Sequence, residues 1–332
     1  MLVLGVETSC DDTAAAVLRD GRTILANTDS SQDQVHGPYG GVVPELASRQ
    51  HIQNILPIVD GALRQAGAAL GDLDGIAVTY GPGLVGSLLV GLSMVKGISF
   101  RTGIPYVGVN HLEAHLLAIH LEHDVPFPYI ALLASGGHTL LYCVVDVGDY
   151  RHLGGTRDDA AGEAFDKAAK MMGLGYPGGR VIDQLAQSGD RRAIRFPRAR
   201  LRGSPYDFSF SGIKTALWHY LKTQQRESWE SRRADIAASF QEAVIDMLVD
   251  PTIKSALAGG VHRLVLAGGV AANSRLRERM KERAEQEGLE VFFPAPKFCT
   301  DNGAMIALTG THWLKRGRRD DFRLNADADL TL

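Results

Sequence analysis

The sequence predicts an α/β protein built from two duplicated lobes. Its 332 residues exceed the roughly 250–300 residues at which a single hydrophobic core stops growing. Short apolar runs typical of strands alternate with longer stretches of helical pattern. A polar turn that joins two strands occurs near residue 8 and again near residue 136, which indicates a duplicated lobe with a nucleotide cleft between the copies.

The first lobe is predicted to open with three strands, at 2–6, 14–18 and 23–27. Asp20-Gly21 between the second and third apolar runs is a strong hairpin signal. The pattern then predicts helices over about 43–66 and 85–101, and strands over 75–79 and 106–109. We expect this lobe to span residues 1–126, with a final segment, 301–332, returning to it.

The second lobe, expected over 127–300, repeats this order. Strands are predicted over 129–134 and 140–145, joined by a polar turn at 135–139. Helices are predicted from about residue 163, over 234–248 and from 273. Before the last of them, a strand over 263–267 ends in Gly268-Gly269.

Composition limits the classes of protein that fit. The formal net charge of −3 means that any contact with nucleic acid depends on a local basic patch or on a partner. The three cysteines form no CxxC pair, which argues against a disulfide framework and a cysteine-based zinc site. Neither a leader peptide nor a long apolar run is evident, so we expect a cytoplasmic protein with no membrane association.

Polar residues cluster after the first strand, in Glu7-Thr8-Ser9-Cys10-Asp11-Asp12-Thr13. Turn amides and hydroxyls suit a phosphate or carboxylate, and acids suit a metal, a water or an amine. We therefore take Glu7, Asp11 and Asp12 as candidate catalytic acids. The alternative is a polar hairpin that only caps its strands.

Two further turns are candidate nucleotide sites. Ser135-Gly136-Gly137-His138-Thr139 lets backbone amides approach a ligand without a Cβ in the way, although a tight hairpin needs the same residues. The run from Gly268-Gly269 to Asn273 joins a strand to a helix N-terminus, which suits an anion or a sugar.

The sharpest signal is His111-Leu112-Glu113-Ala114-His115, in a helical pattern. Histidines at i and i+4 share one helix face and can bind one metal ion; two surface histidines are the alternative. Asp301, in a polar turn before an apolar helix, is a candidate third ligand. A zinc peptidase is a rival interpretation, but Glu113 is turned by about 200° from His111, away from the metal face.

Other charged residues have two interpretations each. Asp166 and Asp183 suit the hydroxyls of a ribose, and helix capping is the alternative. Six arginines between 191 and 202 suit a phosphate backbone, and a solvated loop is the alternative; the segment 315–319 shares this ambiguity.

The motifs together resemble one family, the tRNA adenosine threonylcarbamoyltransferases (TsaD, Kae and Qri-type proteins), in its bacterial branch. The matching segments span nearly the whole chain in order: ETSCDDT at 7–13, GGVVPELASRQH at 40–51, GPGLVGSLLVG at 81–91, HLEAH at 111–115, SGGHT at 135–139, DDAAGEAFDKAAK at 158–170, YPGG at 176–179, FSFSGIKTA at 208–216, AGGVAAN at 267–273 and FCTDNGAMIA at 298–307. Many members carry Asp-Glu where this chain has Asp11-Asp12, so Asp12 is one methylene shorter.

The resemblance implies the actin/Hsp70/sugar-kinase fold (ASKHA) and one divalent metal, Fe²⁺ or alternatively Zn²⁺, held by His111, His115 and Asp301. It implies threonylcarbamoyl adenylate as the donor and the exocyclic amine of adenosine 37 as the acceptor, in tRNAs that read codons beginning with A. The implied contacts to the nucleotide part of the donor are Ala134, Ser135, Gly136, Gly137, His138, Asp166, Gly179, Asp183 and Asn273. The implied partners are tRNA, a catalytically silent TsaB-like paralogue, a small TsaE-like ATPase and, upstream, an adenylate-forming TsaC-like enzyme.

Three other functions fit parts of the pattern. A metallopeptidase is disfavoured by the position of Glu113 and by the nucleotide turns. A nucleotide-dependent switch or small-molecule kinase of the same fold would turn over ATP without tRNA. A non-catalytic scaffold paralogue would be expected to lose the histidine pair, which this chain keeps.

Overall fold

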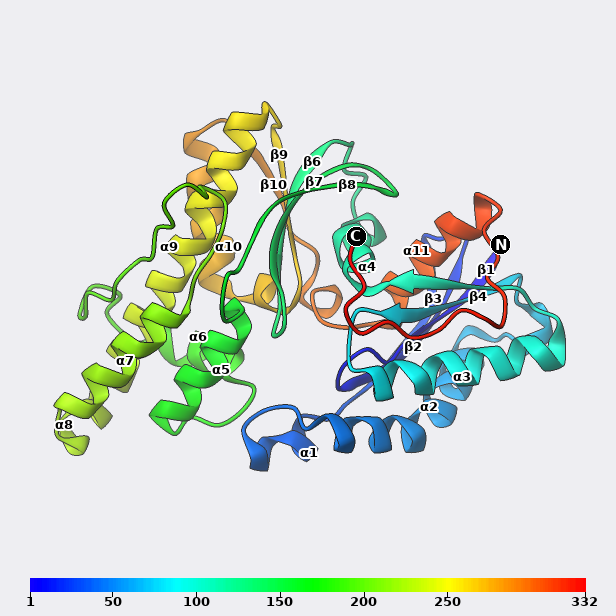
Figure 1. The fold of residues 1–332 in the computed structure, drawn as a ribbon, viewed down its shortest axis with the longest axis horizontal. Coiled ribbons are helices and arrows are strands. Elements are labelled where there is room, and N and C mark those ends of the chain that lie inside the picture. Colours follow the sequence, from blue (N-terminus) through cyan, green and yellow to red (C-terminus); the bar gives the residue numbers. More distant parts are fainter. The chain divides into compact units, whose positions relative to one another are not determined.

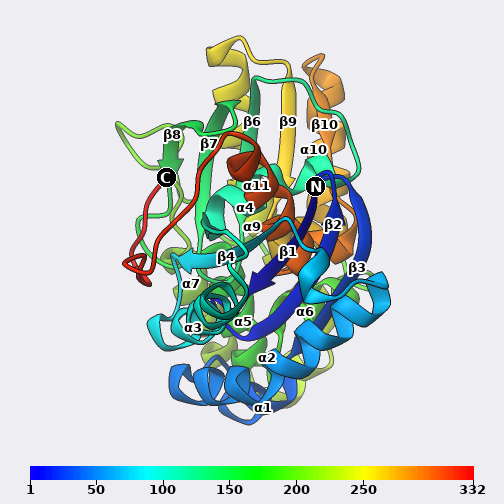
Figure 2. The same cartoon turned by 90° about the vertical axis from the view of Figure 1, so that its right-hand side faces the viewer.

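Two five-stranded sheets organise the chain in a computed structural model that describes residues 1–332 (Figures 1 and 2). One unit comprises Met1–Asp124 and Thr300–Leu332, and the other comprises Val125–Cys299. Each unit combines a mixed sheet with helices, so the predicted α/β class is confirmed.

The first unit contains a sheet of strand order β3-β2-β1-β4-β5. Strands β1, β2 and β3 pair antiparallel, whereas β4 and β5 continue the sheet parallel to β1. The elements are β1 (Leu2–Glu7), β2 (Asp12–Arg19), β3 (Thr23–Ser31), α1 (Asp33–His36), α2 (Pro44–Ala66), β4 (Gly75–Gly81), α3 (Val85–Thr102), β5 (Tyr106–Asn110), α4 (His111–Leu117) and α11 (Gly303–Lys315).

Side chains of β1 point alternately to the two faces of the sheet, and different helices cover these faces. Leu4 and Val6 pack into the core formed with α2 and α3. Gly5 points the other way, where a Cβ would lie 2.3 Å from the carbonyl oxygen of Gly303 in α11. Since successive strand residues face opposite sides, Glu7 lies on the same face as Gly5, toward α11.

The second unit repeats this topology with strand order β10-β9-β6-β7-β8. Here β6, β7 and β8 pair antiparallel, and β9 and β10 continue the sheet parallel to β6. The elements are β6 (Tyr129–Ala134), β7 (Thr139–Asp146), β8 (Asp149–Gly155), α5 (Ala161–Met172), α6 (Gly178–Ala186), α7 (Ser211–Thr223), α8 (Arg226–Glu230), α9 (Arg233–Gly259), β9 (Arg263–Ala267), α10 (Ser274–Gln286) and β10 (Glu290–Phe292).

Helix α9 differs most from the sequence prediction, because it continues past Pro251 to Gly259 instead of ending near residue 248. Val249 and Ile253, on either side of the proline, are buried in the main core of this unit. Burial of this apolar face outweighs the hydrogen bond that the proline removes. No helix of either unit combines the length and the apolar character needed to cross a bilayer.

Candidate functional site

The two histidines of the HLEAH motif lie on one face of α4. Asn110 caps this helix, because its side-chain oxygen accepts the backbone N–H groups of Leu112 (2.8 Å) and Glu113 (3.3 Å). The helix therefore begins at His111, and His115 follows one turn later on the same face. The two imidazole rings have centroids 4.7 Å apart.

Asp301, just before α11, completes a three-residue group with these histidines. One oxygen of Asp301 lies 3.1 Å from Nε2 of His115 and 3.6 Å from Nε2 of His111. The three ligand atoms lie within 4.8 Å of one another, and both histidines are buried. Two imidazole nitrogens and a carboxylate that converge in this way fit one divalent metal ion, with positions left for other ligands.

Behind His111 lies the carboxylate of Glu7, which is fully buried. One oxygen of Glu7 is 3.1 Å from Nδ1 of His111 and accepts the hydroxyl of Thr79 (2.6 Å). The other oxygen accepts the backbone N–H of Ser9. Metal-ligating histidines typically donate their second ring nitrogen to such a carboxylate, so Glu7 has the position of a residue that orients His111.

The charges of these groups are strongly coupled. Burial by itself lowers the pKa of His111, but the carboxylates of Asp301 and Glu7 outweigh it and raise this pKa to about 9. Burial raises the pKa of Glu7, and the imidazole of His111 outweighs it and lowers the pKa. Because a histidine must be neutral to bind a metal ion, metal binding has to displace a proton from His111.

Glu113 occupies the other side of α4. Its carboxylate accepts the indole N–H of Trp313 in α11, at 3.0 Å, and the side chain is buried. The predicted orientation away from the metal face is therefore found. A base placed there is not available to a metal-bound water, as peptidase chemistry would need.

The turn between β1 and β2 carries Asp11 and Asp12, both half-buried. Burial raises the pKa of both carboxyls, and the negative charge of Asp301 raises them further. For Asp12 the pKa reaches about 8. Acids whose pKa is raised toward neutrality by burial and like charges are typical of functional sites.

His51 of α2, a residue that the sequence analysis did not single out, fixes this turn. Its Nδ1 lies 2.8 Å from the hydroxyl of Thr13, and its Nε2 lies 3.0 Å from the carbonyl oxygen of Cys10. Nε2–H donates to that carbonyl. Burial lowers the pKa of the ring, which favours its neutral form, and in that form Nδ1 accepts the hydroxyl of Thr13. The motif 40–51 contains this residue, but no spacing rule connects it to the turn.

In the second unit, Ala134 ends β6, and Ser135 to His138 form the turn into β7. Ser135 accepts the backbone N–H of His138 with its hydroxyl at 3.1 Å, which closes the turn. Gly136 and Gly137 are exposed, and a Cβ at either position would meet nothing within 4 Å. The turn is a tight hairpin whose glycine backbone is open to a ligand.

Three of the predicted nucleotide contacts serve as helix caps. Asp166 accepts the backbone N–H of Gly178 at the start of α6 (2.7 Å), and Asp183 accepts both the N–H and the hydroxyl of Ser274. Asn273 caps α10 through the N–H of Leu276 and donates to Gln241. The capping interpretation is thus found for Asp166 and Asp183, and Gly179 is the second residue of α6.

Comparisons with a family model and with individual proteins lead to the same family. A family model described as TsaD, tRNA N6-adenosine threonylcarbamoyltransferase, matches residues 23–308. A protein with that name from Syntrophotalea carbinolica is 55% identical over 100% of this chain and 97% of its own. Another, from Anaeromyxobacter sp. (strain Fw109-5), is 56% identical over 98% of both chains.

Solved structures with low sequence identity show a similar fold. Full-length HypF in its phosphate- and nucleotide-bound form matches 95% of this chain and 56% of its own, with a TM-score of 0.62 and 15% identity. Component A of the (R)-2-hydroxyglutaryl-CoA dehydratase of Acidaminococcus fermentans matches 96% of this chain and 100% of its own, with a TM-score of 0.56 and 17% identity. At these identities the likeness concerns the fold alone.

Proposed function

The chain belongs to the TsaD family of tRNA N6-adenosine threonylcarbamoyltransferases, and from this premise we propose how its residues share the reaction. The enzyme transfers a threonylcarbamoyl group to N6 of an adenosine in tRNA and forms N6-threonylcarbamoyladenosine. We propose that the donor is threonylcarbamoyl adenylate and that the acceptor is adenosine 37 of tRNAs that read codons beginning with A. The tRNA substrate also makes the cytoplasm the expected compartment.

The proposed step is an acyl transfer with a defined atom balance. The N6 amine attacks the carbamoyl carbon and forms an N–C bond, and the bond from that carbon to the phosphate oxygen breaks. AMP leaves with the bonding electrons, and one proton is lost from N6. The protein therefore has to orient the amine, accept or relay this proton and stabilise charge on the oxygens.

Asp11 is proposed to orient or deprotonate the amine, with Asp12 beside it. Burial raises the pKa of both carboxyls, for Asp12 to about 8, and His51 holds the turn that carries them. Glu7 has both oxygens engaged inside the unit, so its proposed role is to orient His111 instead of touching the substrate.

His111, His115 and Asp301 are proposed to hold the metal ion, Fe²⁺ first and Zn²⁺ as the alternative. This convergence of three ligand atoms is the observation that carries the proposal. A bound divalent ion would supply Lewis acidity toward phosphate and carbonyl oxygens.

The nucleotide half of the donor is proposed to bind the second unit at Ala134, Ser135, Gly136, Gly137 and His138, with Asp166, Gly179, Asp183 and Asn273. The open glycine backbone between β6 and β7 supports this assignment. The caps formed by Asp166, Asp183 and Asn273 support it indirectly, because they fix the starts of α6 and α10.

We also propose the family's partners for this chain: a catalytically silent TsaB-like paralogue, a TsaE-like small ATPase and a TsaC-like enzyme that supplies the adenylate. These assignments rest on the family resemblance.

Replacing Asp11 with Asn tests the role of the acid turn. Asn keeps the shape but accepts no proton, so we expect kcat for transfer from synthetic threonylcarbamoyl adenylate to fall by about 100-fold or more. Bound metal, measured by elemental analysis, should be unchanged. Full turnover by the variant would show that Asp11 has no such role.

A further inference from the structure

A row of unpaired arginines lies on the second unit, in the segment 191–202 that follows α6. This segment contains six arginines and no acid. Two of them are paired: Arg191 with Glu278 (3.3 Å) and Arg198 with Asp246 (3.0 Å). The side chains of Arg192, Arg195, Arg200 and Arg202 are exposed and have no hydrogen-bond or ion-pair partner.

The segment is fixed along helix α9. The N–H of Ile194 donates to the hydroxyl of Ser239 (3.1 Å), and the ring of Phe196, 3% exposed, packs edge-on against Phe240. Further along, Arg198 pairs with Asp246 in the same helix. Since these anchors advance together along the segment and α9, residues 194 to 198 are held along about two turns of that helix, and Arg200 and Arg202 follow directly after the last anchor.

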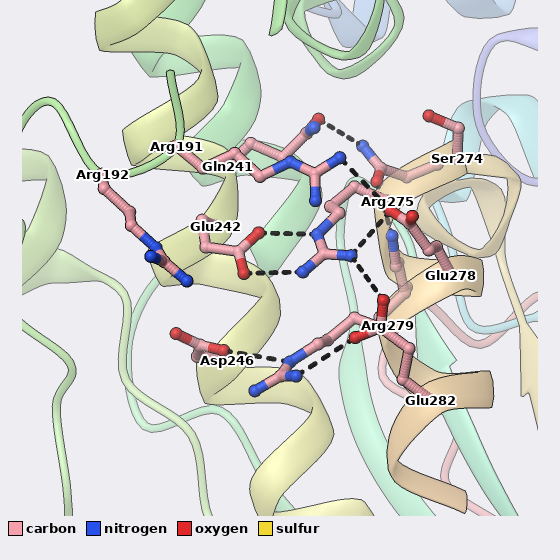
Figure 3. A network of polar contacts seen from close by, with 12 residues as sticks. Arg191, Arg192, Gln241, Glu242, Asp246, Ser274, Arg275, Glu278, Arg279 and Glu282 are labelled. Atoms are coloured by element: carbon pink, nitrogen blue, oxygen red, sulfur yellow. Dashed lines mark hydrogen bonds and ion pairs between the residues drawn. The ribbon is translucent and has the colours of Figure 1, made fainter. Parts of the chain in front are cut away.

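Most acids near this support are already neutralised by ion pairs. Figure 3 shows Arg275 paired with both oxygens of Glu242, at 2.7 and 2.8 Å, and also with Glu278. Arg279 pairs with Glu282 and Asp246, and Arg283 pairs with Asp250. Asp190, just before the segment, is the exception: its carboxylate accepts the backbone N–H of Arg192 and forms no ion pair. The four unpaired guanidiniums are therefore a local excess of positive charge.

This excess is unusual for a chain with a net charge of −3, whose average surface repels a polyanion. Guanidinium groups bind phosphate oxygens with two parallel hydrogen bonds. Because much of the segment is held against α9, little backbone freedom is lost when its arginines bind. We propose that Arg192, Arg195, Arg200 and Arg202 form a contact surface for the phosphate backbone of tRNA. This inference rests on tRNA as the acceptor substrate.

The test is the affinity of the full chain for an unmodified tRNA transcript as a function of salt. The variant with all four arginines changed to Gln should bind at least 10-fold more weakly near 100 mM salt. The slope of log K against log salt should be less steep by about 3, close to one unit for each lost phosphate contact. Unchanged melting temperature would establish that the fold is kept.

A matched control separates local contacts from overall charge. Arg22, Arg64, Arg226 and Arg323 are also exposed, but each is paired with an acid. Changing these four to Gln removes the same charge and should alter the affinity and the slope little. Equal losses in both variants, or no loss in the first, would overturn the proposal; the latter result would suggest an acidic protein partner.

Transfer kinetics keep this inference distinct from the proposed function. In the complete assay, the variant of the unpaired arginines should show a raised KM for tRNA and a nearly unchanged kcat. A wild-type protein that binds tRNA through these arginines but transfers nothing would contradict the proposed chemistry alone. Active wild-type protein whose KM does not depend on these arginines would contradict the surface alone.

Discussion

At the scale of single residues, Glu7 is a fully buried carboxylate that contacts a candidate metal ligand, His111. An ionised carboxylate with no exposed surface is unfavourable unless donors surround it. Here the donors are the backbone of Ser9, the hydroxyl of Thr79 and the ring of His111. The arrangement fixes which ring nitrogen of His111 faces Asp301, so we expect Glu7 to influence metal binding without being a ligand.

Replacing Glu7 with Gln should therefore weaken metal binding. A neutral amide stabilises the ligating tautomer of His111 less well, and loss of such an outer partner typically costs about 10–100-fold in affinity. The measurement is the Kd for Zn²⁺ by chelator competition. Glu113→Gln is the matched control, since Glu113 is buried on the opposite side of α4 and contacts Trp313. Equal affinities of the wild type and Glu7→Gln would rule out the positioning role.

Asp12 should lower the stability of the metal-free protein as the pH rises. Its pKa of about 8 lies well above the value of an unfolded aspartate, because burial and the charges of Asp301 and Asp11 disfavour the ionised form. Stability is therefore lost as the pH rises from about 4 to about 8, because the unfolded chain releases this proton while the folded protein keeps it, and the loss levels off above pH 8. Asp12→Asn should remove that loss.

Urea unfolding between pH 5 and pH 9 measures this effect. The gain in unfolding free energy for Asp12→Asn should increase from pH 5 to about pH 8, by on the order of 1–3 kcal/mol, and then level off. Asp149→Asn, at an exposed strand position of the second unit, should show no such trend. If the difference in unfolding free energy between the wild type and Asp12→Asn stayed constant with pH, the pKa of the Asp12 carboxyl would not be raised in the folded protein.

Local patterns in the sequence predicted that His111 and His115 lie together, but not which residues hold them in place. The i, i+4 spacing predicted one face for His111 and His115, because helix geometry is local. Glu7 was expected among the catalytic acids, and its engagement with Thr79 and His111 depends on how strands and helices pack. His51 was missed for the same reason: its two contacts lie about forty residues back along the chain.

At the scale of elements, helix caps link segments that are distant in sequence. Asp158 accepts the hydroxyls of Ser209 and Ser211 and the backbone N–H groups of Phe210 and Ser211, at the start of α7. The next residue, Asp159, binds Lys167 and Lys214. These contacts join the motif 158–170 to the motif 208–216. The two acids at the start of the first motif bind the serine hydroxyls and the lysine of the second.

Asp158→Ala should destabilise the second unit by about 1–2 kcal/mol, the usual cost of a lost cap. The partial burial of this carboxyl favours its neutral form, but the four hydrogen bonds outweigh burial and lower its pKa. The cap's contribution should accordingly be present at neutral pH and decline as the pH falls through the lowered pKa. Urea unfolding at pH 7 and pH 3.5 measures both effects.

Asp149→Ala is the control for this experiment, since it removes an acid from the same unit without removing a cap. An Asp158→Ala protein as stable as this control at pH 7 would show that α7 does not need the cap.

Several elements escaped the sequence prediction for identifiable reasons. Helix α6 is short and begins with two glycines, which indicated a turn, and the two buried residues of β8 are glycines at its end, so β8 lacks the apolar alternation of a half-buried strand. The end of α9 was missed at Pro251, where burial in the core prevails over local preference. Strands with continuous apolar runs, such as β1 and β6, were predicted well because burial on both faces leaves that pattern.

At the scale of the whole molecule, the two units repeat one strand order with the same directions. The sequence indicated this duplication through its two polar turns, although the copies share no motif. The units differ in the residues they carry: the first holds the converging histidines and the acid turn, and the second holds the open glycine turn and the exposed arginines. The two units share a topology and differ in the residues of their equivalent turns. Topology alone would therefore not have predicted the function.

The central claim is that the group of His111, His115 and Asp301 serves threonylcarbamoyl transfer to tRNA. The most direct test is transfer of labelled threonine into unmodified tRNA by purified protein with ATP, bicarbonate, the adenylate-forming enzyme and the partner proteins, with His111→Ala in parallel. The account predicts label in tRNA with the wild type, and loss of both label and bound metal with the variant. No label from the wild type, in a system that works with a family relative, or full activity of His111→Ala, would contradict it.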